Sequence, residues 1–159
     1  MAKQSETVTI ELAGLPATRD LAECLARLAK RGDVLALRGD LGSGKTEFAR
    51  HFVRHLTDLG EDVPSPTFTL VQTYDSEVCE IWHFDLYRLE RPEEAFELGI
   101  DDAFHDAISL IEWPERLGPY LPRDRLDVHL SITKGKNHRQ VILTPHGDWS
   151  QRLRECGHG

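Results

Sequence analysis

The chain has 159 residues, which suits one domain with a proper core and leaves no room for a second enzyme domain. Its net charge is −8, and residues 1–112 carry 11 basic and 22 acidic side chains, whereas residues 113–159 carry 8 and 5. Because broad contact with a nucleic-acid backbone needs a positive surface, the acidic body argues against that class of function.

The apolar pattern predicts strands and helices that alternate along a single domain, residues 1–159. Strands are expected at 7–12, 33–37, within 63–74, and at 79–87, 107–113, 125–132 and 139–144. Helices are expected at 17–31, 45–56 and 91–98, the last capped by Gly99. The last two strands flank a polar turn and predict a closing antiparallel pair. The fold class is therefore α/β with a mixed sheet.

Residues 39–50 read GDLGSGKTEFAR and contain the pattern GxxxxGK[ST] between an expected strand and an expected helix. The glycines let the backbone curl, so that N–H groups from Gly42 to Glu47 surround a phosphate at a helix N-terminus. Lys45 adds a positive charge for the β- and γ-phosphates, and the Thr46 hydroxyl is placed to hold Mg²⁺. The pattern predicts a nucleotide site that includes Gly42, Ser43, Gly44, Lys45, Thr46 and Glu47.

Two acidic residues, Asp85 and Glu112, end apolar strands at the place where α/β sheets deliver side chains to a ligand crevice. A carboxylate there is costly unless it is paired or binds a metal. For Glu112 we favour Mg²⁺ contact over an N-cap role ahead of Pro114. For Asp85 we favour a catalytic role, with structural pairing to Arg88 as the alternative.

Other features leave alternatives open. Thr67 lies on a proline-framed loop and is either a nucleotide-sensing switch residue or part of a rigid strand entry. His51 and His55 have the spacing of a metal pair but no acidic third ligand follows, so we do not favour a metal there. The nucleotide base is expected between the loop just before the first expected helix, around Leu15–Thr18, and the turn near Lys136.

Several basic residues follow position 112 and give the C-terminal part its positive excess: Arg123, Arg125, Lys134, Lys136 and Arg139. They either contact nucleotide, RNA or an acidic partner, or form a solvated face, which is the more common arrangement. His83, Trp82 and Trp113 are expected to be core or rim aromatics first and partner contacts second.

The start of the chain is polar and no long apolar run follows, so we expect neither a signal peptide nor a membrane span. Cys24, Cys79 and Cys156 have no CxxC spacing and predict reduced thiols in a cytoplasmic protein.

Four segments, GDLGSGKT, SPTFTL, HFDLYRL and EWPER, occur in an order and at separations that resemble the TsaE family of small bacterial P-loop ATPases. The resemblance runs from about Thr18 to Pro122. It implies a P-loop NTPase-like three-layer sandwich with a mixed, largely parallel sheet. It also implies an Mg²⁺-dependent ATPase that works with a TsaB–TsaD pair, which transfers a threonylcarbamoyl group to a tRNA adenosine beside the anticodon, so that contact with tRNA is indirect.

The same resemblance implies roles for single residues. Thr46 and Glu112 would be the Mg²⁺ ligands, and Asp85 would be required for hydrolysis together with Lys45 and Glu112. Glu47 departs from the family, in which a second Thr or Ser is common at this position. Its negative charge suits a helix N-terminus but lies near the phosphates.

Three other functions are compatible with a phosphate loop of this kind. A GTPase is disfavoured because the only asparagine, Asn137, is followed by His138 and Arg139 rather than by an NKxD motif. A small P-loop kinase would use the same loop and carboxylates, but it also needs an acceptor pocket and an arginine-bearing lid. A binding module that uses ATP only as a conformational ligand is the third alternative.

Overall fold

The structure is a computed structural model that describes residues 7–57, 63–66, 69–133 and 138–155. Within these ranges, seven strands form one sheet in the order β1-β7-β6-β2-β5-β4-β3. The strands are β1 (Val8–Ala13), β2 (Val34–Arg38), β3 (Val71–Tyr74), β4 (Glu80–Asp85), β5 (Ala107–Glu112), β6 (Leu126–Ile132) and β7 (His138–Pro145). The helices are α1 (Leu15–Leu28), α2 (Lys45–Leu56), α3 (Glu94–Glu97), α4 (Ile100–Asp106), η1 (Pro114–Tyr120) and α5 (Trp149–Glu155).

Parallel pairing is confined to the centre of the sheet. β2 pairs in parallel with β5 and β6, and β5 pairs in parallel with β4. The outer pairings, β1 with β7, β6 with β7 and β3 with β4, are antiparallel. The predicted mixed α/β sheet and its antiparallel β6–β7 pair are thus confirmed. The sheet is partly rather than largely parallel, because the strands on both sides of its centre pair in antiparallel fashion.

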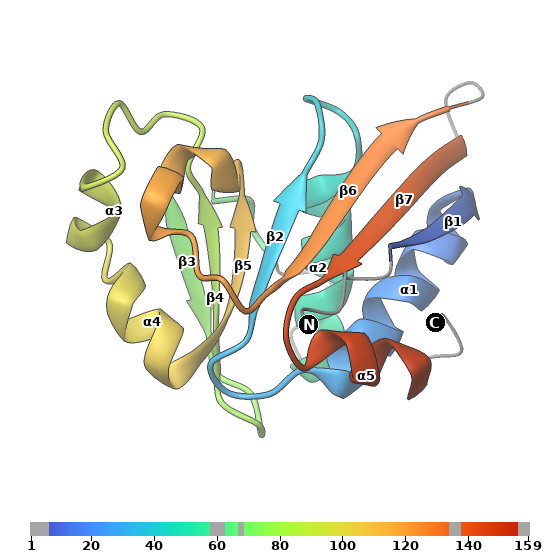
Figure 1. The fold of residues 1–159 in the computed structure, drawn as a ribbon, viewed down its shortest axis with the longest axis horizontal. Coiled ribbons are helices and arrows are strands. Elements are labelled where there is room, and N and C mark those ends of the chain that lie inside the picture. Colours follow the sequence, from blue (N-terminus) through green and yellow to red (C-terminus); the bar gives the residue numbers. More distant parts are fainter. Residues whose placement is uncertain (1–6, 58–62, 67–68, 134–137, 156–159) are drawn as a thin grey trace, which may run out of the picture.

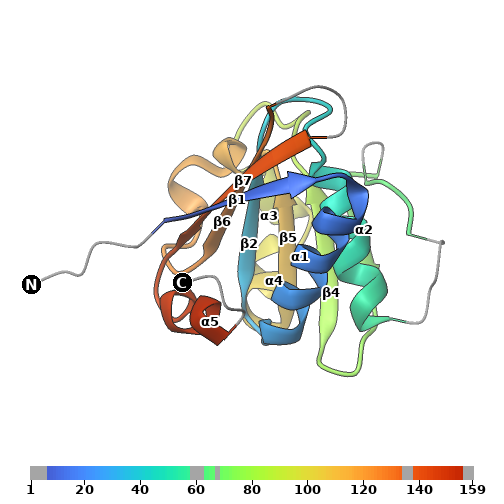
Figure 2. The ribbon, with the colours of Figure 1, turned by 90° about the vertical axis from the view of Figure 1, so that its right-hand side faces the viewer.

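Helices cover both faces of the sheet and make three layers, as Figures 1 and 2 show. On one face α1 and α2 turn apolar stripes toward the strands, with Leu21 and Leu25 on α1 and Phe48 and Phe52 on α2 all buried. On the other face α3, α4 and η1 pack a second cluster around Phe84 of β4. The two clusters fix the sheet between the helices.

The strand expected within residues 63–74 occupies the end of that segment. Val71–Tyr74 forms β3. Leu70 directly before it has a positive φ of 69°, and its N–H donates to the Pro66 carbonyl at 2.7 Å. Thr67 and Phe68 lie outside the described residues.

The expected helix over 91–98 is also different in the structure. Gly99, which has a φ of 82°, ends the short α3 and serves as the N-cap of a second helix, α4. Ile100 and Ala103 of α4 are buried at a spacing of three, a helical signal too short to stand out in the sequence. The helices η1 and α5 were likewise not predicted.

The cysteines differ from expectation at one position. Cys24 is disulfide-bonded, whereas Cys79 is a free, buried thiol. The prediction of reduced thiols is therefore wrong at Cys24, because pairing depends on how the fold brings segments together, which spacing along the chain does not show. In the part of the chain that the structure describes, no helix combines the length and apolar character needed to cross a bilayer.

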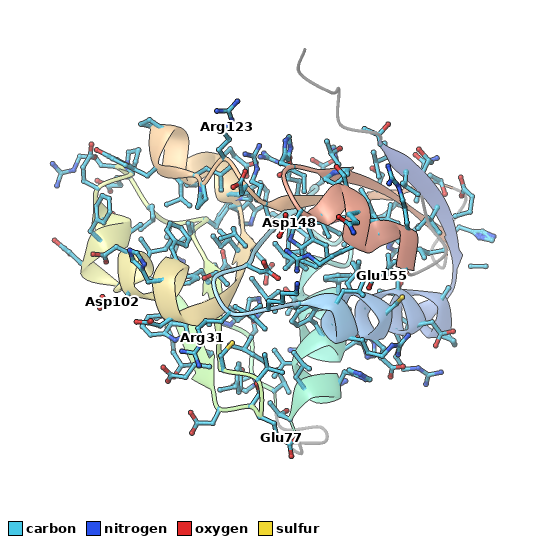
Figure 3. The ribbon with its side chains drawn as sticks, turned by 60° about the horizontal axis from the view of Figure 1, so that its bottom comes forward. Arg31, Glu77, Asp102, Arg123, Asp148 and Glu155 are labelled. Carbon is cyan, nitrogen blue, oxygen red and sulfur yellow. The ribbon has the colours of Figure 1, made fainter. Side chains whose placement is uncertain are left out.

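The basic residues of the C-terminal part have separate surroundings. Arg125 pairs with Asp127 at 3.0 Å, and Arg139 reaches the loop before α2. Arg123 is exposed, and Figure 3 shows its side chain directed away from the body of the molecule. Lys134 and Lys136 lie outside the described residues.

Candidate nucleotide site

The loop between β2 and α2 is shaped by glycines. Gly39 has a φ of 141°, and a Cβ there would collide with the Leu130 carbonyl oxygen and the Ser43 hydroxyl. Gly44 is left-handed, with a φ of 108°, and forms the N-cap of α2. The loop therefore closes tightly over the sheet and exposes the first N–H groups of α2, which have no partner within the helix.

Lys45, the first residue of α2, turns its amine back over this loop. Its Nζ donates to the Gly39 carbonyl at 2.6 Å and lies 3.5 Å from the centre of the Trp113 ring. Burial lowers the pKa of Lys45, although Glu112, Glu115, Asp85 and Asp40 act in the opposite direction. The Lys45 amine is held by the Gly39 carbonyl and the face of the Trp113 ring. A phosphate oxygen can replace these contacts, because its charge-assisted hydrogen bond to the amine is stronger.

Thr46 and Glu112 lie in direct contact, as a shared metal site requires. The Thr46 hydroxyl lies 3.0 and 3.1 Å from the two oxygens of the Glu112 carboxylate. The second of these oxygens, Oε2, also lies 2.7 Å from His83 Nε2. Glu112 is only 3% exposed, and no side-chain cap bond is seen at the start of η1. The contacts of Glu112 are thus with α2 and β4 rather than with the backbone of η1.

Asp85 stands beside Glu112 at the same edge of the sheet. The two residues are partners in the parallel register of β4 and β5. Asp85 is 8% exposed, and its Oδ1 accepts the Tyr87 N–H at 3.1 Å. Two buried carboxylates therefore lie side by side, opposite the N-terminus of α2.

A pocket of about 510 Å³ opens in front of these groups, a size typical of small-molecule sites. Its walls are drawn from the loop and α2, the ends of β4 and β5, and the start of α1: Gly14, Leu15, Thr18, Leu41, Gly42, Ser43, Gly44, Lys45, Thr46, Glu47, Asp85, Tyr87, Arg88, Glu112, Trp113, Leu130 and Arg139. All the candidate site residues except Lys136 meet here. Leu15 and Thr18 belong to the first turn of α1, not to a loop before it. Lys136 and Thr67 lie outside the described residues, so the predictions made for them stay predictions.

The residues present fit a phosphate and a magnesium ion. Ser43 lines the pocket and is 2% exposed, and its buried hydroxyl has no hydrogen-bond partner among the described residues, which leaves a polar group that a phosphate oxygen would satisfy. The Glu112 carboxylate and Thr46 hydroxyl form an all-oxygen pair. Mg²⁺ favours such ligands and completes its shell with water and substrate phosphates, so one carboxylate and one hydroxyl suffice.

His51 lacks such a setting. Its Nε2 lies 3.8 Å from Glu47, and burial lowers the pKa of its imidazole. Over the described ranges, no group of three or more His, Cys, Asp or Glu side chains is placed to hold a metal.

Sequence reasoning missed three parts of this site. His83 is fully buried, as a core histidine would be, but it also contacts Glu112. Trp113 has a left-handed backbone and supports the Lys45 amine. Arg139 donates from Nε to the Ser43 carbonyl at 3.1 Å, so β7 reaches the phosphate loop. Only His83 carried a usable signal, since it lies two residues before Asp85 on the same face of a strand.

Comparisons with known proteins agree with this geometry. The family model described as "Threonylcarbamoyl adenosine biosynthesis protein TsaE" matches residues 12–141. The chain is 39% identical over 134 residues to a tRNA threonylcarbamoyladenosine biosynthesis protein TsaE from Rickettsia conorii, covering 84% of this chain and 77% of the relative. It is 37% identical over 139 residues to the Bacillus subtilis protein of that name, covering 87% and 85%.

A solved structure shows the same fold. The crystal structure of Bacillus subtilis YdiB superposes with a TM-score of 0.78 at 29% identity, covering 97% of this chain and 95% of that one. The family match spans most of the chain and includes the phosphate loop and both carboxylate-bearing strands. The chain belongs to the TsaE family of tRNA threonylcarbamoyladenosine biosynthesis proteins.

Proposed function

We propose that this chain is an Mg²⁺-dependent ATP hydrolase that supports threonylcarbamoyl transfer to tRNA by a TsaB–TsaD-type protein complex. The observation that carries the proposal is the contact of Thr46 with Glu112, at 3.0 and 3.1 Å, next to a glycine-rich loop and its lysine. Family membership supports the pathway.

The loop and Lys45 bind the phosphates of ATP. The N–H groups at the start of α2 and the Ser43 hydroxyl donate to phosphate oxygens, and the Lys45 amine leaves the Gly39 carbonyl to neutralise charge on the β- and γ-phosphates. Thr46 and Glu112 hold Mg²⁺, which when bound neutralises charge that develops on the phosphates.

Asp85 has a separate role in this proposal. It lies beside Glu112 in the register of β4 and β5 and lines the same pocket. A carboxylate there can accept a hydrogen bond from water and orient its oxygen for attack on the γ-phosphate. Glu112 then contributes both to Mg²⁺-dependent ATP binding and to ATP hydrolysis, whereas Asp85 contributes to hydrolysis alone.

The acidic body argues that contact with tRNA runs through the partner proteins. We also propose that the chain acts as a single domain, on the argument from its length, and that it acts in the cytoplasm, because its family belongs to a tRNA modification pathway.

The decisive experiment measures ATP hydrolysis by the chain with and without a TsaB–TsaD pair. We expect low turnover alone and a clear increase in the assembled complex, with Lys45→Ala as the matched inactive control. Detection of a phosphorylated small molecule in place of free phosphate would instead identify a kinase. Full support of tRNA modification by a chain that lacks both Lys45 and Glu112 would identify a binding module that does not hydrolyse ATP.

A further inference from the structure

His83 is a polar residue in the apolar centre of the sheet. It lies on β4, where Ile81, His83 and Asp85 point to the face covered by α2, and it pairs in register with Leu110 of β5. Its side chain is 0% exposed. An imidazole in such a place costs desolvation free energy that a leucine would not, so its polar contact needs an explanation.

The His83 imidazole has one hydrogen-bond partner among the described residues, the Glu112 carboxylate. His83 Nε2 lies 2.7 Å from Glu112 Oε2, and because a carboxylate oxygen only accepts, the Nε2–H donates. His83 Nδ1 is buried and has no partner among the described residues. The only hydrogen bond that the described structure gives this ring is therefore the one that it donates to Glu112.

The two donors to Glu112 differ in what they fix. The Thr46 hydroxyl is nearly equidistant from both carboxylate oxygens, at 3.0 and 3.1 Å, so it does not choose between them. His83 contacts Oε2 alone and sits on a rigid strand between two others. His83 is thus the only one of the two donors that distinguishes Oε2 from Oε1.

We propose that His83 is a positioning residue that holds the Glu112 carboxylate in the orientation needed to bind Mg²⁺ with Thr46. Thr46 would bind a metal through an oxygen lone pair and could still donate its O–H to Glu112, but its O–H does not select one carboxylate oxygen, whereas the bond from His83 does. Hydrogen bonds behind a metal ligand restrict its motion and typically change metal affinity or activity by about 10- to 100-fold. This inference rests on the proposed function, because it assumes a metal at Glu112.

Two amide substitutions at position 83 test whether the histidine acts through a hydrogen bond to Glu112 or only through being polar. In His83→Gln the amide nitrogen lies near the position of Nε2 and can still donate to Glu112. In His83→Asn it lies near the position of Nδ1 and falls short. We expect His83→Asn to lower the Mg²⁺ affinity of the ADP-bound chain by about 10- to 100-fold. His83→Gln should keep most of the wild-type Mg²⁺ affinity.

Calorimetry with ADP provides the measurement without any turnover. ADP affinity in EDTA should stay within about twofold in both variants, because His83 lies outside the pocket walls. His105→Gln, at an exposed position on α4, is the matched control and should leave both affinities unchanged. Equal Mg²⁺ affinity in the wild type and in the Asn variant would overturn the inference and leave the proposed function standing. A wild type that binds ADP equally with Mg²⁺ and EDTA would overturn the proposed function, and the inference with it.

A second measurement uses only the wild type and a Glu112 variant, so it does not depend on the folding of a His83 variant. In the ligand-free protein, the Nε2–H of His83 should exchange slowly with water and give its own NMR signal, because it is buried and hydrogen-bonded. Glu112→Gln should shift this signal. A signal that does not respond to Glu112→Gln would show that the two side chains do not interact in solution, and would overturn the inference.

Discussion

Asp127 and Glu112 are buried carboxylates on parallel strands of the same sheet, but they are surrounded by different kinds of side chain. Asp127 on β6 contacts Arg125 at 3.0 Å, Arg38 at 3.2 Å and His146 at 3.0 Å. Glu112 on β5 contacts a hydroxyl and an imidazole, and no arginine lies within bonding distance among the described residues. One carboxylate is matched by guanidinium groups, and the other faces a pocket.

We interpret the difference as one between a structural carboxylate and the carboxylate that we propose binds a ligand. Burial alone would raise the pKa of Asp127, but the hydrogen bond from Arg125, the charge of Arg38 and the bond with His146 outweigh it and lower the pKa. Such a group is satisfied by its own fold. Glu112 has no guanidinium partner among the described residues and lines a pocket where a metal ion could bind, an arrangement that function requires and stability does not.

The largest expected effect lies at Asp85, the neighbour of Glu112. Asp85→Ala should leave nucleotide binding nearly intact and lower turnover in the assembled complex by about 10²- to 10⁴-fold, because a water-orienting group acts mainly in the transition state. Glu112→Ala should weaken Mg²⁺-dependent binding and hydrolysis together. Phosphate release and calorimetry on both variants provide the comparison. Wild-type turnover in Asp85→Ala would mean that Asp85 is structural and that the two-carboxylate mechanism is wrong.

The next largest effect concerns Lys45, a positively charged side chain in the pocket wall. Lys45→Ala should weaken ATP binding by roughly 1.5–3 kcal/mol, the value of one charge-assisted contact, or about 10- to 150-fold. Lys45→Arg is a useful companion, because it keeps the charge but brings a wide fork into a space closed by Gly39 and Trp113. Calorimetry gives both affinities. Equal affinity in Lys45→Ala and the wild type would place the phosphates elsewhere.

The sequence predicted one side of this comparison better than the other. The phosphate loop, Lys45, Thr46 and both strand-end carboxylates were found because glycine spacing and strand ends are local features. The contacts of Asp127 were not found, because Arg38 and His146 are distant in the chain and meet only when β2 and β7 lie on either side of β6. Arg139 escaped a definite assignment for the same reason.

Element type was predicted more reliably than element ends. The apolar strands β2 and β5 and the amphipathic helices α1 and α2 were identified within a few residues, because burial on one or both faces leaves a clear periodic pattern. The short α4, η1 and α5 were missed because seven residues provide fewer than three helical turns of pattern.

Stability measurements sharpen the comparison of the two carboxylates. Asp127→Asn should lower the free energy of unfolding by about 1.5 kcal/mol, at the low end for charged hydrogen bonds because Arg38 and His146 are partly exposed. Glu112→Gln should change it by less than about 1 kcal/mol in either direction, since no arginine pairing is lost. Urea unfolding curves at pH 7 measure both. A larger loss in Glu112→Gln would contradict the distinction drawn here.

The pH dependence gives a smaller signal with a defined sign. The pKa of Asp127 is lowered by folding, so its contribution to stability is present above its unfolded value and is lost as pH falls through the folded value. The stability difference between the wild type and Asp127→Asn should therefore be constant from about pH 6 to 5 and shrink below about pH 4. Unfolding curves over this range test the sign. A difference that grows on acidification would mean that Arg125, Arg38 and His146 do not stabilise the ionised carboxylate.

The smallest expected effect is at the start of α1, where the base should lie. The phosphate loop and α2 supply Lys45 and Thr46 to the pocket wall, whereas the start of α1 supplies Gly14, Leu15 and Thr18. Leu15 is 63% exposed, and an aliphatic side chain cannot distinguish the exocyclic groups of adenine from those of guanine. We therefore expect GTP to bind no tighter than ATP, with affinities that differ by less than about tenfold, or about 1.4 kcal/mol. Competition of each unlabelled nucleotide against a fluorescent ATP analogue, with Mg²⁺ present, gives the ratio. Leu15→Ala should weaken both nucleotides by a similar small factor, because it removes apolar contact without removing any base-reading group. A strong preference for GTP would show that a polar group reads guanine at the start of α1, and the pocket would then bind its base as selectively as it binds phosphate.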